Sequence, residues 1–272
     1  MSEEKSYVIG THDAEIERLG LQHRVWRPSV LEFWRLAGLT DSMTVIDAGA
    51  GPGYAAADLA EIVGDTGRVL AVERSHRFVS ALQARAKAYG IANIAAVESD
   101  LLDYAWPTEA ADRIWCRWVL AFVSDPAKVL RGMLKALKPG GALMLHEYYD
   151  YASWHIAPRS AEFEAYVAKI IASWRASGGE PDIGLALPRL LSNMGLEIEL
   201  VRPVVFAAHP GDFVWQWPTT FARSNAHVMA ENGTIPRAEA ERIGTILTQY
   251  EADPASLVIT PGVLQIVARK PA

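Results

Sequence analysis

The sequence predicts an α/β fold in which helices cover both faces of a doubly wound, mostly parallel sheet. Two observations lead to this prediction. Between residues 44 and 150, short segments rich in β-branched and other apolar residues alternate with longer segments whose apolar residues recur every three or four positions. A glycine-rich turn follows the first of the short segments. Strands that alternate with helices in this way form βαβ units, whose strands are parallel.

The N-terminal part is expected to be helical over residues 12–37, because its apolar side chains are spaced for one buried face. Pro28 should divide this segment into two helices, since proline fits the first turn of a helix but not its interior. After it we expect strands at 44–50, 68–75, 93–100, 112–122 and 142–149, and helices at 54–63, 75–89 and 126–137. The segment "LKPGG" at 137–141 should end the last helix and turn into the next strand.

The C-terminal half departs from this alternation. We expect helices at 159–176 and 184–194 and strands at 196–206 and 257–270. Roughly fifty mostly helical residues separate the last two strands. Such insertions suggest the wall or lid of a pocket rather than a second autonomous domain.

Composition and charge exclude several classes of protein. The chain has 272 residues, a net charge of −6 and one cysteine, Cys116, so neither a disulfide framework nor a cysteine-based zinc site is expected within it. The acidic balance provides no global field that would attract nucleic acid. No apolar run has the length of a membrane span, and the N-terminus lacks a secretory signal pattern. We therefore expect a cytoplasmic protein without a metal, nucleic-acid or membrane partner.

The glycine turn after the first expected strand reads "VIDAGAGPGY", residues 45–54. Gly49, Gly51 and Gly53 stand at every second position, whereas a dinucleotide-binding turn has the spacing G-x-G-x-x-G. Tyr54 occupies the place of the third glycine in that pattern. Asp47 would repel a pyrophosphate but attract an ammonium group. The turn therefore favours a ligand that carries an adenosine and a cation, a description that S-adenosylmethionine fits.

This stretch resembles motif I of the class I S-adenosylmethionine-dependent methyltransferases, in which two apolar residues and an acid precede x-G-x-G-x-G. Later segments follow the family's order over residues 40–150. The similarity is to small-molecule methyltransferases of the ubiquinone and menaquinone biosynthesis kind. It implies a seven-stranded Rossmann-like methyltransferase fold, with a helical lid at 1–40, a cofactor-binding core at 41–150, and the rest of the sheet with substrate-pocket insertions at 151–272.

The resemblance also assigns roles to individual residues. Glu73, at the end of the second strand, would accept hydrogen bonds from the ribose hydroxyls, and Asp100 would bind the adenine amino group. Arg117 belongs to the loop that meets the methionine end of the cofactor. From the N-terminal helix, Gln22 could reach the cofactor carboxylate and Trp26 could stack near the sulfonium. The full expected set for S-adenosylmethionine is Gln22, Trp26, Asp47, Gly49, Gly51, Gly53, Glu73, Arg74, Asp100, Leu101, Arg117 and Trp118.

The catalytic candidates are His146, Glu147 and Tyr149, which leave the fifth strand at its C-terminal end. Histidine is the usual general base near neutral pH, although a buried structural role for His146 is equally compatible with the sequence. Glu147 could hold an amine or hydroxyl of the substrate. Of Tyr148 and Tyr149, one should face the site and the other the core, because strand neighbours point to opposite faces; we assign Tyr149 to the site. Further along, "GDFVWQWPTTF" at 211–221 spaces aromatic residues for a core or a pocket lining.

The acceptor is not identified by any motif. We expect a small organic molecule, with O-methylation slightly ahead of N- or C-methylation. Two alternatives remain open: a protein on the same fold that binds the cofactor for other chemistry, and a methyltransferase acting on proteins. A nicotinamide-dependent oxidoreductase is disfavoured by Tyr54 and Asp47. A homodimer is also compatible with the aromatic N-terminal segment, which could form an interface.

Overall fold

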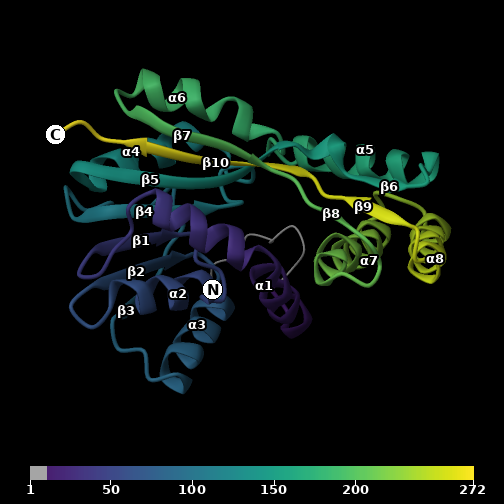
Figure 1. Ribbon diagram of the computed structural model, residues 1–272, viewed down its shortest axis with the longest axis horizontal. Helices are drawn as coiled ribbons and strands as arrows, with labels where there is room; N and C mark the ends of the chain where they lie inside the picture. The colour runs from purple at the N-terminus through teal and green to yellow at the C-terminus, as the bar shows by residue number, and fades with distance from the viewer. Residues whose placement is uncertain (1–10) are drawn as a thin grey trace.

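The structure is a computed structural model that describes residues 11–272 and is organised around one large sheet (Figure 1). In spatial order its strands are β3 (Ile94–Glu98), β2 (Arg68–Glu73), β1 (Thr44–Ala48), β4 (Ala111–Arg117), β5 (Leu137–Asp150), β10 (Gly262–Arg269) and β7 (Glu197–Val204). Neighbours from β3 to β5 pair in parallel, whereas β10 is antiparallel to both β5 and β7. The predicted doubly wound, mostly parallel sheet of seven strands is confirmed.

Helices cover both faces of this sheet. The helices are α1 (Asp13–Leu36), α2 (Tyr54–Val63), α3 (His76–Ala88), α4 (Pro126–Ala136), α5 (Ala161–Ala176), α6 (Leu187–Asn193), α7 (Gln216–Glu231) and α8 (Arg237–Ala252). α1 and α2 pack on one face and α4 and α6 on the other. A hydrophobic core lies on each face of the sheet. Successive side chains of a strand point to opposite faces, so Met144 of β5 is part of one core and Leu145 is part of the other. The predicted helices at 54–63, 75–89 and 126–137 are present, within a residue or so at each end.

α1 is one continuous helix of 24 residues, so the predicted division at Pro28 is wrong. Proline in a helix interior costs about 3 kcal/mol because it removes one backbone hydrogen bond and crowds the preceding turn. On either side of it, Trp26, Val30, Phe33 and Trp34 are completely buried. Burying one such side chain contributes about 1.5–3 kcal/mol, so their combined burial outweighs the proline.

The "LKPGG" segment is the first part of β5 rather than a separate turn before it. The prediction of a helix end at Leu137 holds, because α4 stops at Ala136. Beyond it, the N–H of Gly140 donates to the carbonyl of Lys270 at 3.0 Å, and the N–H of Lys270 donates to the carbonyl of Gly141 at 2.8 Å. This pairing extends the sheet across a segment whose composition indicates a turn.

The C-terminal insertions contain a second, smaller sheet, which was not predicted from the sequence. Its three strands are β6 (His155–Ala157), β9 (Leu257–Ile259) and β8 (Ala207–Ala208), all antiparallel. In Figure 1 this sheet lies beyond one end of the large sheet, together with α5, α7 and α8. The part of the chain that the structure describes also contains three short 3₁₀ helices, at Tyr151–Ser153, Ile183–Leu185 and Phe213–Trp215. None of the helices within residues 11–272 is both long and apolar enough to cross a membrane.

Candidate functional site

A cavity of about 1390 Å³ opens at the carboxyl ends of the parallel strands. Gly49 follows β1, Glu73 ends β2, Asp100 follows β3, Trp118 follows β4 and Tyr148 is near the end of β5, and all five line the cavity. The crevice outside the carboxyl ends of the strands is where open α/β sheets bind their ligands. Its walls also include residues of α1, α5 and α7. The predicted cofactor residues that line it are Gln22, Gly49, Glu73, Arg74, Asp100, Leu101 and Trp118.

The glycine turn has the left-handed backbone that its sequence indicates. Gly49, Gly51 and Gly53 have φ angles of 78°, 55° and 82°. A Cβ at Gly49 would lie 2.3 Å from Cγ2 of Val119, so the turn and the loop after β4 approach each other too closely for any side chain. At Gly51 a Cβ would meet nothing within 4 Å. Only the backbone angle therefore requires glycine at this second position.

Glu73 ties this turn to the end of β2. Its Oε2 accepts a hydrogen bond from the N–H of Gly51 at 2.9 Å, and its Oε1 accepts one from the N–H of Ser75 at 2.9 Å. Burial raises the pKa of this carboxyl, while the backbone N–H groups of Ser75, Gly51 and Arg74 favour its charged form. Each carboxylate oxygen can accept a second hydrogen bond, so Glu73 can receive a pair of hydroxyl groups from the cavity. Asp100 is held in a similar way, by the N–H of Leu102 at 3.0 Å.

Asp47 and Arg117 lie near the ends of neighbouring strands, beside the cavity rather than on its surface. Asp47 is buried, whereas Arg117 is half-buried with its Nη1 atom enclosed. Within residues 11–272, Oδ2 of Asp47 and Nη1 of Arg117 have no hydrogen-bond partner. Burial raises the pKa of Asp47 to about 7, an effect that Arg117 opposes and Glu73 reinforces. Burial lowers the pKa of Arg117 to about 10, against the attraction of Asp47. A buried carboxyl and a half-buried guanidinium, each with an enclosed atom that lacks a partner within residues 11–272, are suited to a ligand that carries both an ammonium and a carboxylate.

Trp26 does not line the cavity. It is completely buried behind the wall, where its ring makes edge-to-face contacts with Trp118 at 5.4 Å, Trp217 at 5.0 Å and His146 at 4.8 Å between ring centroids. Trp26 therefore supports Trp118, which does line the cavity, and is not itself placed to stack on a ligand there. Gly51 and Gly53 likewise shape the turn without lining the cavity.

The predicted catalytic residues His146 and Glu147 are fully buried and do not line the cavity. Burial, together with the nearby charge of Arg117, holds the pKa of His146 well below its ordinary value, so its imidazole is neutral. Its Nδ1 accepts a hydrogen bond from the side-chain amide of Gln265 at 3.3 Å. Glu147 instead holds the loop after β4, since its Oε1 accepts the N–H groups of Val119 at 2.9 Å and Leu120 at 3.0 Å.

Tyr148, not Tyr149, faces the cavity. The alternation of strand side chains was predicted, but the assignment of the two tyrosines to the two faces is reversed. Tyr149 packs on the opposite side, where its ring fills the space beside Gly262 and its Cβ approaches Gly184. A shift of one residue along a strand moves a side chain to the other face, and the sequence contains no local feature that sets this register.

Two residues of α1 that the sequence analysis missed, Glu15 and Arg18, belong to the cavity wall. Arg18 donates to both carboxylate oxygens of Glu15, at 2.7 and 2.6 Å, and to Oε1 of Gln22 at 3.1 Å. The indole N–H of Trp217 donates to the same Gln22 oxygen at 3.0 Å. The spacing of these residues, at i, i+3 and i+7, was the only available signal, and on a helix it also fits an ordinary surface ion pair.

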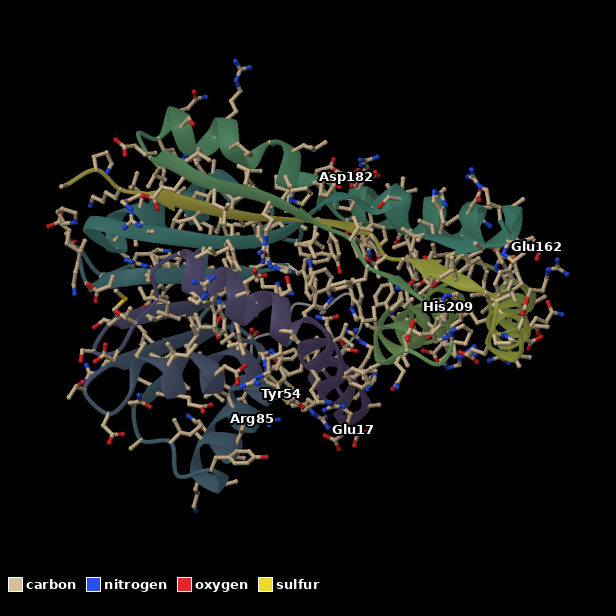
Figure 2. The ribbon with its side chains drawn as sticks, viewed as in Figure 1. Glu17, Tyr54, Arg85, Glu162, Asp182 and His209 are labelled. Atoms are coloured by element: carbon tan, nitrogen blue, oxygen red, sulfur yellow. The ribbon has the colours of Figure 1, made fainter. Side chains whose placement is uncertain are left out.

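Tyr54 fixes α1 in this position. Its hydroxyl donates to the carbonyl of Ile16 at 3.0 Å, and the hydroxyl oxygen occupies the space that a Cβ on Gly20 would take. The guanidinium of Arg85 lies 3.8 Å from the centre of the Tyr54 ring, and Figure 2 shows the two side chains next to each other. The residue that stands in place of a third glycine thus joins α1 to α2 and α3.

The remaining wall of the cavity is aromatic. We call six of its residues the aromatic wall: Tyr148, Tyr151, Trp154, Trp174, Trp217 and Phe221. They come from β5, the turn after it, α5 and α7. Of the aromatic stripe predicted at 211–221, Trp217 and Phe221 line the cavity, whereas Phe213 is 46% exposed outside it. Among the described residues no group of histidine, cysteine and acidic side chains is placed to hold a metal ion.

Comparison with known proteins identifies the family. Residues 39–180, just over half of the chain, match the family model described as a methyltransferase domain. The chain therefore belongs to the methyltransferase-domain family, and its sheet has the Rossmann-like architecture of class I S-adenosylmethionine-dependent methyltransferases that the glycine turn indicated.

The sequence relatives are ubiquinone/menaquinone biosynthesis C-methyltransferases. The UbiE protein of Enterobacter sp. (strain 638) is 29% identical over 155 residues, which cover 53% of this chain and 61% of that protein. The UbiE protein of Proteus mirabilis (strain HI4320) is 30% identical over 149 residues, or 50% and 58%. The chain thus spans about three fifths of the length of the curated relatives it matches.

Solved structures share the fold at low sequence identity. The YcgJ protein of Bacillus subtilis has a TM-score of 0.59 at 16% identity, covering 89% of this chain and 97% of that one. Phosphoethanolamine N-methyltransferase 2 of Haemonchus contortus, in complex with S-adenosyl-L-methionine, has a TM-score of 0.56 at 17% identity, covering 91% and 53%. The cyclase SpnF has a TM-score of 0.54 at 19% identity, covering 88% and 81%. At these identities the likeness concerns the fold alone.

Proposed function

We propose that this protein transfers a methyl group from S-adenosylmethionine to a small organic acceptor. One observation carries the proposal: Gly49 of the glycine turn, Glu73 and Asp100 line one cavity at the carboxyl ends of the strands, and Asp47 and Arg117 lie beside it. Membership of the methyltransferase-domain family supports the same activity. The names of the sequence relatives make carbon the first acceptor atom to test, ahead of the oxygen that the sequence analysis preferred.

The residues present fit this cofactor. Glu73 can accept the two ribose hydroxyls, and Asp100 can accept the adenine amino group. The unpartnered Oδ2 of Asp47 and Nη1 of Arg117 carry the charges that the ammonium and the carboxylate of the methionine end require. Trp118 lines the cavity and stacks on Tyr148 and Trp217, so this part of the cavity has an aromatic surface, and aromatic rings attract a sulfonium. When bound, the cofactor would supply a methyl group on a good leaving group.

The contribution of the protein is then to orient the acceptor and to exclude water. α1 supplies one wall of the cavity through Glu15 and Arg18, and the aromatic wall supplies another. His146 and Glu147 would act through their neighbours: His146 supports the tryptophan rings around it, and Glu147 fixes the loop that packs on the glycine turn. The N-terminal helix as a lid and the division of the chain at residues 40 and 150 remain part of this proposal.

Calorimetric titration tests the cofactor assignment. We expect S-adenosylmethionine and S-adenosylhomocysteine to bind and NAD not to bind, since Tyr54 and Asp47 do not suit a pyrophosphate. Asp47→Asn should weaken S-adenosylhomocysteine binding by about 1–3 kcal/mol, because the ammonium loses a charged partner. Asp65→Asn, at an exposed position after α2, is the matched control. Binding of NAD alone would refute the proposal, whereas the expected pattern leads to screening of acceptors by release of S-adenosylhomocysteine.

A further inference from the structure

The cavity has a second group of polar residues that the cofactor does not require. Glu73, Arg74 and Asp100 lie at the strand ends assigned to the adenosine. The other titratable side chains that line the cavity within residues 11–272 are Glu15, Arg18, Tyr148 and Tyr151. They adjoin the aromatic wall, so this part of the cavity has an apolar surface with one strong hydrogen-bond donor, the guanidinium of Arg18. A role for this compartment in binding the acceptor rests on the proposed function, because the acceptor receives the methyl group of the same donor.

Arg18 is held in place, and within residues 11–272 two of its N–H donors have no partner. The residue is 9% exposed, and its guanidinium makes three hydrogen bonds, two to Glu15 and one to Gln22. A guanidinium has five N–H groups, so two remain for a ligand in the cavity. The bonds to Glu15 fix the plane of the guanidinium, which lowers the entropy lost when it binds a further oxygen. A ligand can therefore gain a charge-assisted hydrogen bond without breaking the ion pair.

The aromatic wall forms a chain of ring contacts around this donor. Tyr148 contacts Tyr151 edge-to-face at 5.0 Å, Tyr151 contacts Trp174 at 4.8 Å, and Trp154 lies 5.9 Å from Phe221 between ring centroids. The guanidinium of Arg18 lies over the Phe221 ring, 5.6 Å from its centre. Rings that pack on one another in this way present flat faces and edges to a ligand, an arrangement that suits another planar ring.

The charge of Arg18 decides which kind of ligand suits this compartment. An aromatic wall alone would also suit an ammonium, since a cation is attracted to ring faces. Here the Phe221 face is already occupied by the guanidinium of Arg18, so this face is not available to a second cation. The positive charge of Arg18 also acts on Tyr148 and Tyr151. Burial raises the pKa of both phenols, and the charge of Arg18 opposes this increase. An anionic oxygen would find a donor at the same place.

We propose that Arg18 is a specificity-determining residue and that the acceptor is a flat aromatic molecule with an anionic oxygen, such as an aromatic carboxylate. The ring lies against the aromatic wall, and the anionic group binds the two remaining N–H groups of Arg18. Glu15 is the positioning residue that holds the guanidinium in this orientation. A small aliphatic ammonium is less well suited, because the Phe221 face is occupied and the remaining N–H groups of Arg18 offer it no acceptor.

Equilibrium binding of four probes tests this assignment, by tryptophan fluorescence with and without saturating S-adenosylhomocysteine. The probes are 2-naphthoate, 2-naphthylmethanol, 2-naphthylmethylammonium and decahydro-2-naphthoate, which separate charge from planarity. We expect 2-naphthoate to bind about tenfold or more tightly than the other three. The double variant Glu15→Gln/Arg18→Met removes the pair without leaving a buried charge unpaired. It should lose that preference for 2-naphthoate while its affinity for 2-naphthylmethanol stays within twofold.

The control is Arg27→Met, on the same helix, where Arg27 pairs with Asp58 and its side chain is 44% exposed outside the cavity. It should leave all four affinities unchanged. Tightest binding of the ammonium, equal binding of the decahydro compound, or an unaltered 2-naphthoate affinity in the double variant would each overturn the assignment. S-adenosylhomocysteine titrated into the same preparations keeps the two proposals separate. If it does not bind, the proposed function fails, and the probe affinities measured without it still decide the nature of the compartment.

Discussion

Glu147 is the residue whose replacement we expect to alter the pH dependence of stability. Its side chain is fully buried, and burial raises its pKa from 4.5 to about 7 against the effect of the backbone donors of Val119, Leu120 and Ala121. Oε2 has no hydrogen-bond partner within residues 11–272, and the thiol of Cys116, 4.0 Å from Oε1, is a weak donor that offsets little of the cost of burying the charge. Glu147→Gln keeps an oxygen acceptor for the loop and removes the titration.

The magnitude depends on the difference between the folded and unfolded pKa values. A carboxyl group whose pKa is raised by folding binds its proton more tightly in the folded protein. Its contribution to stability is therefore present below pH 4.5 and is lost as the pH rises through the folded pKa of about 7. For Glu147 this loss amounts to about 3 kcal/mol in total. The wild type should lose roughly 2–3 kcal/mol of unfolding free energy relative to Glu147→Gln between pH 5 and pH 8.5.

Urea unfolding at a series of pH values between these limits measures the difference directly. The pH dependence of this free-energy difference is the test, rather than its value at any one pH. The buried amide of the variant changes the unfolding free energy by an amount that is the same at every pH. Glu197→Gln, at the exposed start of β7, controls for the removal of a glutamate as such. A difference between wild type and Glu147→Gln that stays constant from pH 5 to pH 8.5 would refute this reasoning. A difference that changes in the opposite direction would mean that Glu147 has a stabilising partner when charged.

The glycine turn and the end of α1 lead to two further predictions. Gly49→Ala and Gly51→Ala should both lose about 1–2 kcal/mol of stability to the left-handed backbone, but only Gly49→Ala adds a collision with Val119. Thermal unfolding should therefore show a lower stability for Gly49→Ala than for Gly51→Ala. Adding Val119→Ala to Gly49→Ala should restore part of the lost stability. Equal stabilities of the two glycine variants would count against the collision with Val119. Arg113→Met should lose about 1–3 kcal/mol in urea unfolding, because Arg113 donates to the two backbone carbonyls that follow α1, while the exposed Arg68→Met should change little.

The order of elements could be predicted from the sequence because it depends on local patterns. The periodicity of apolar residues separates helices from strands, and the glycines of the turn have no alternative that allows their backbone angles. Glu73 and Asp100 were predicted from the resemblance to the methyltransferases. Both line the cavity because Glu73 ends β2 and Asp100 comes two residues after β3, at the edge where the carboxyl ends of the parallel strands meet. The continuous helix through Pro28 could not be predicted, because the side chains that bury the residues on either side of the proline are distant in sequence.

The fold class, the glycine turn and the acids that face the cavity could be predicted because they are set by residues close together in the chain. The side chains that complete the site depend instead on the packing of distant elements. Tyr148 rather than Tyr149 faces the cavity because of the register of β5, and His146 is enclosed by tryptophans from α1 and the loop after β4. Arg18 meets the aromatic wall only because α1 packs against α7, an element about two hundred residues further along the chain. Such contacts depend on how whole elements pack, which no local pattern encodes.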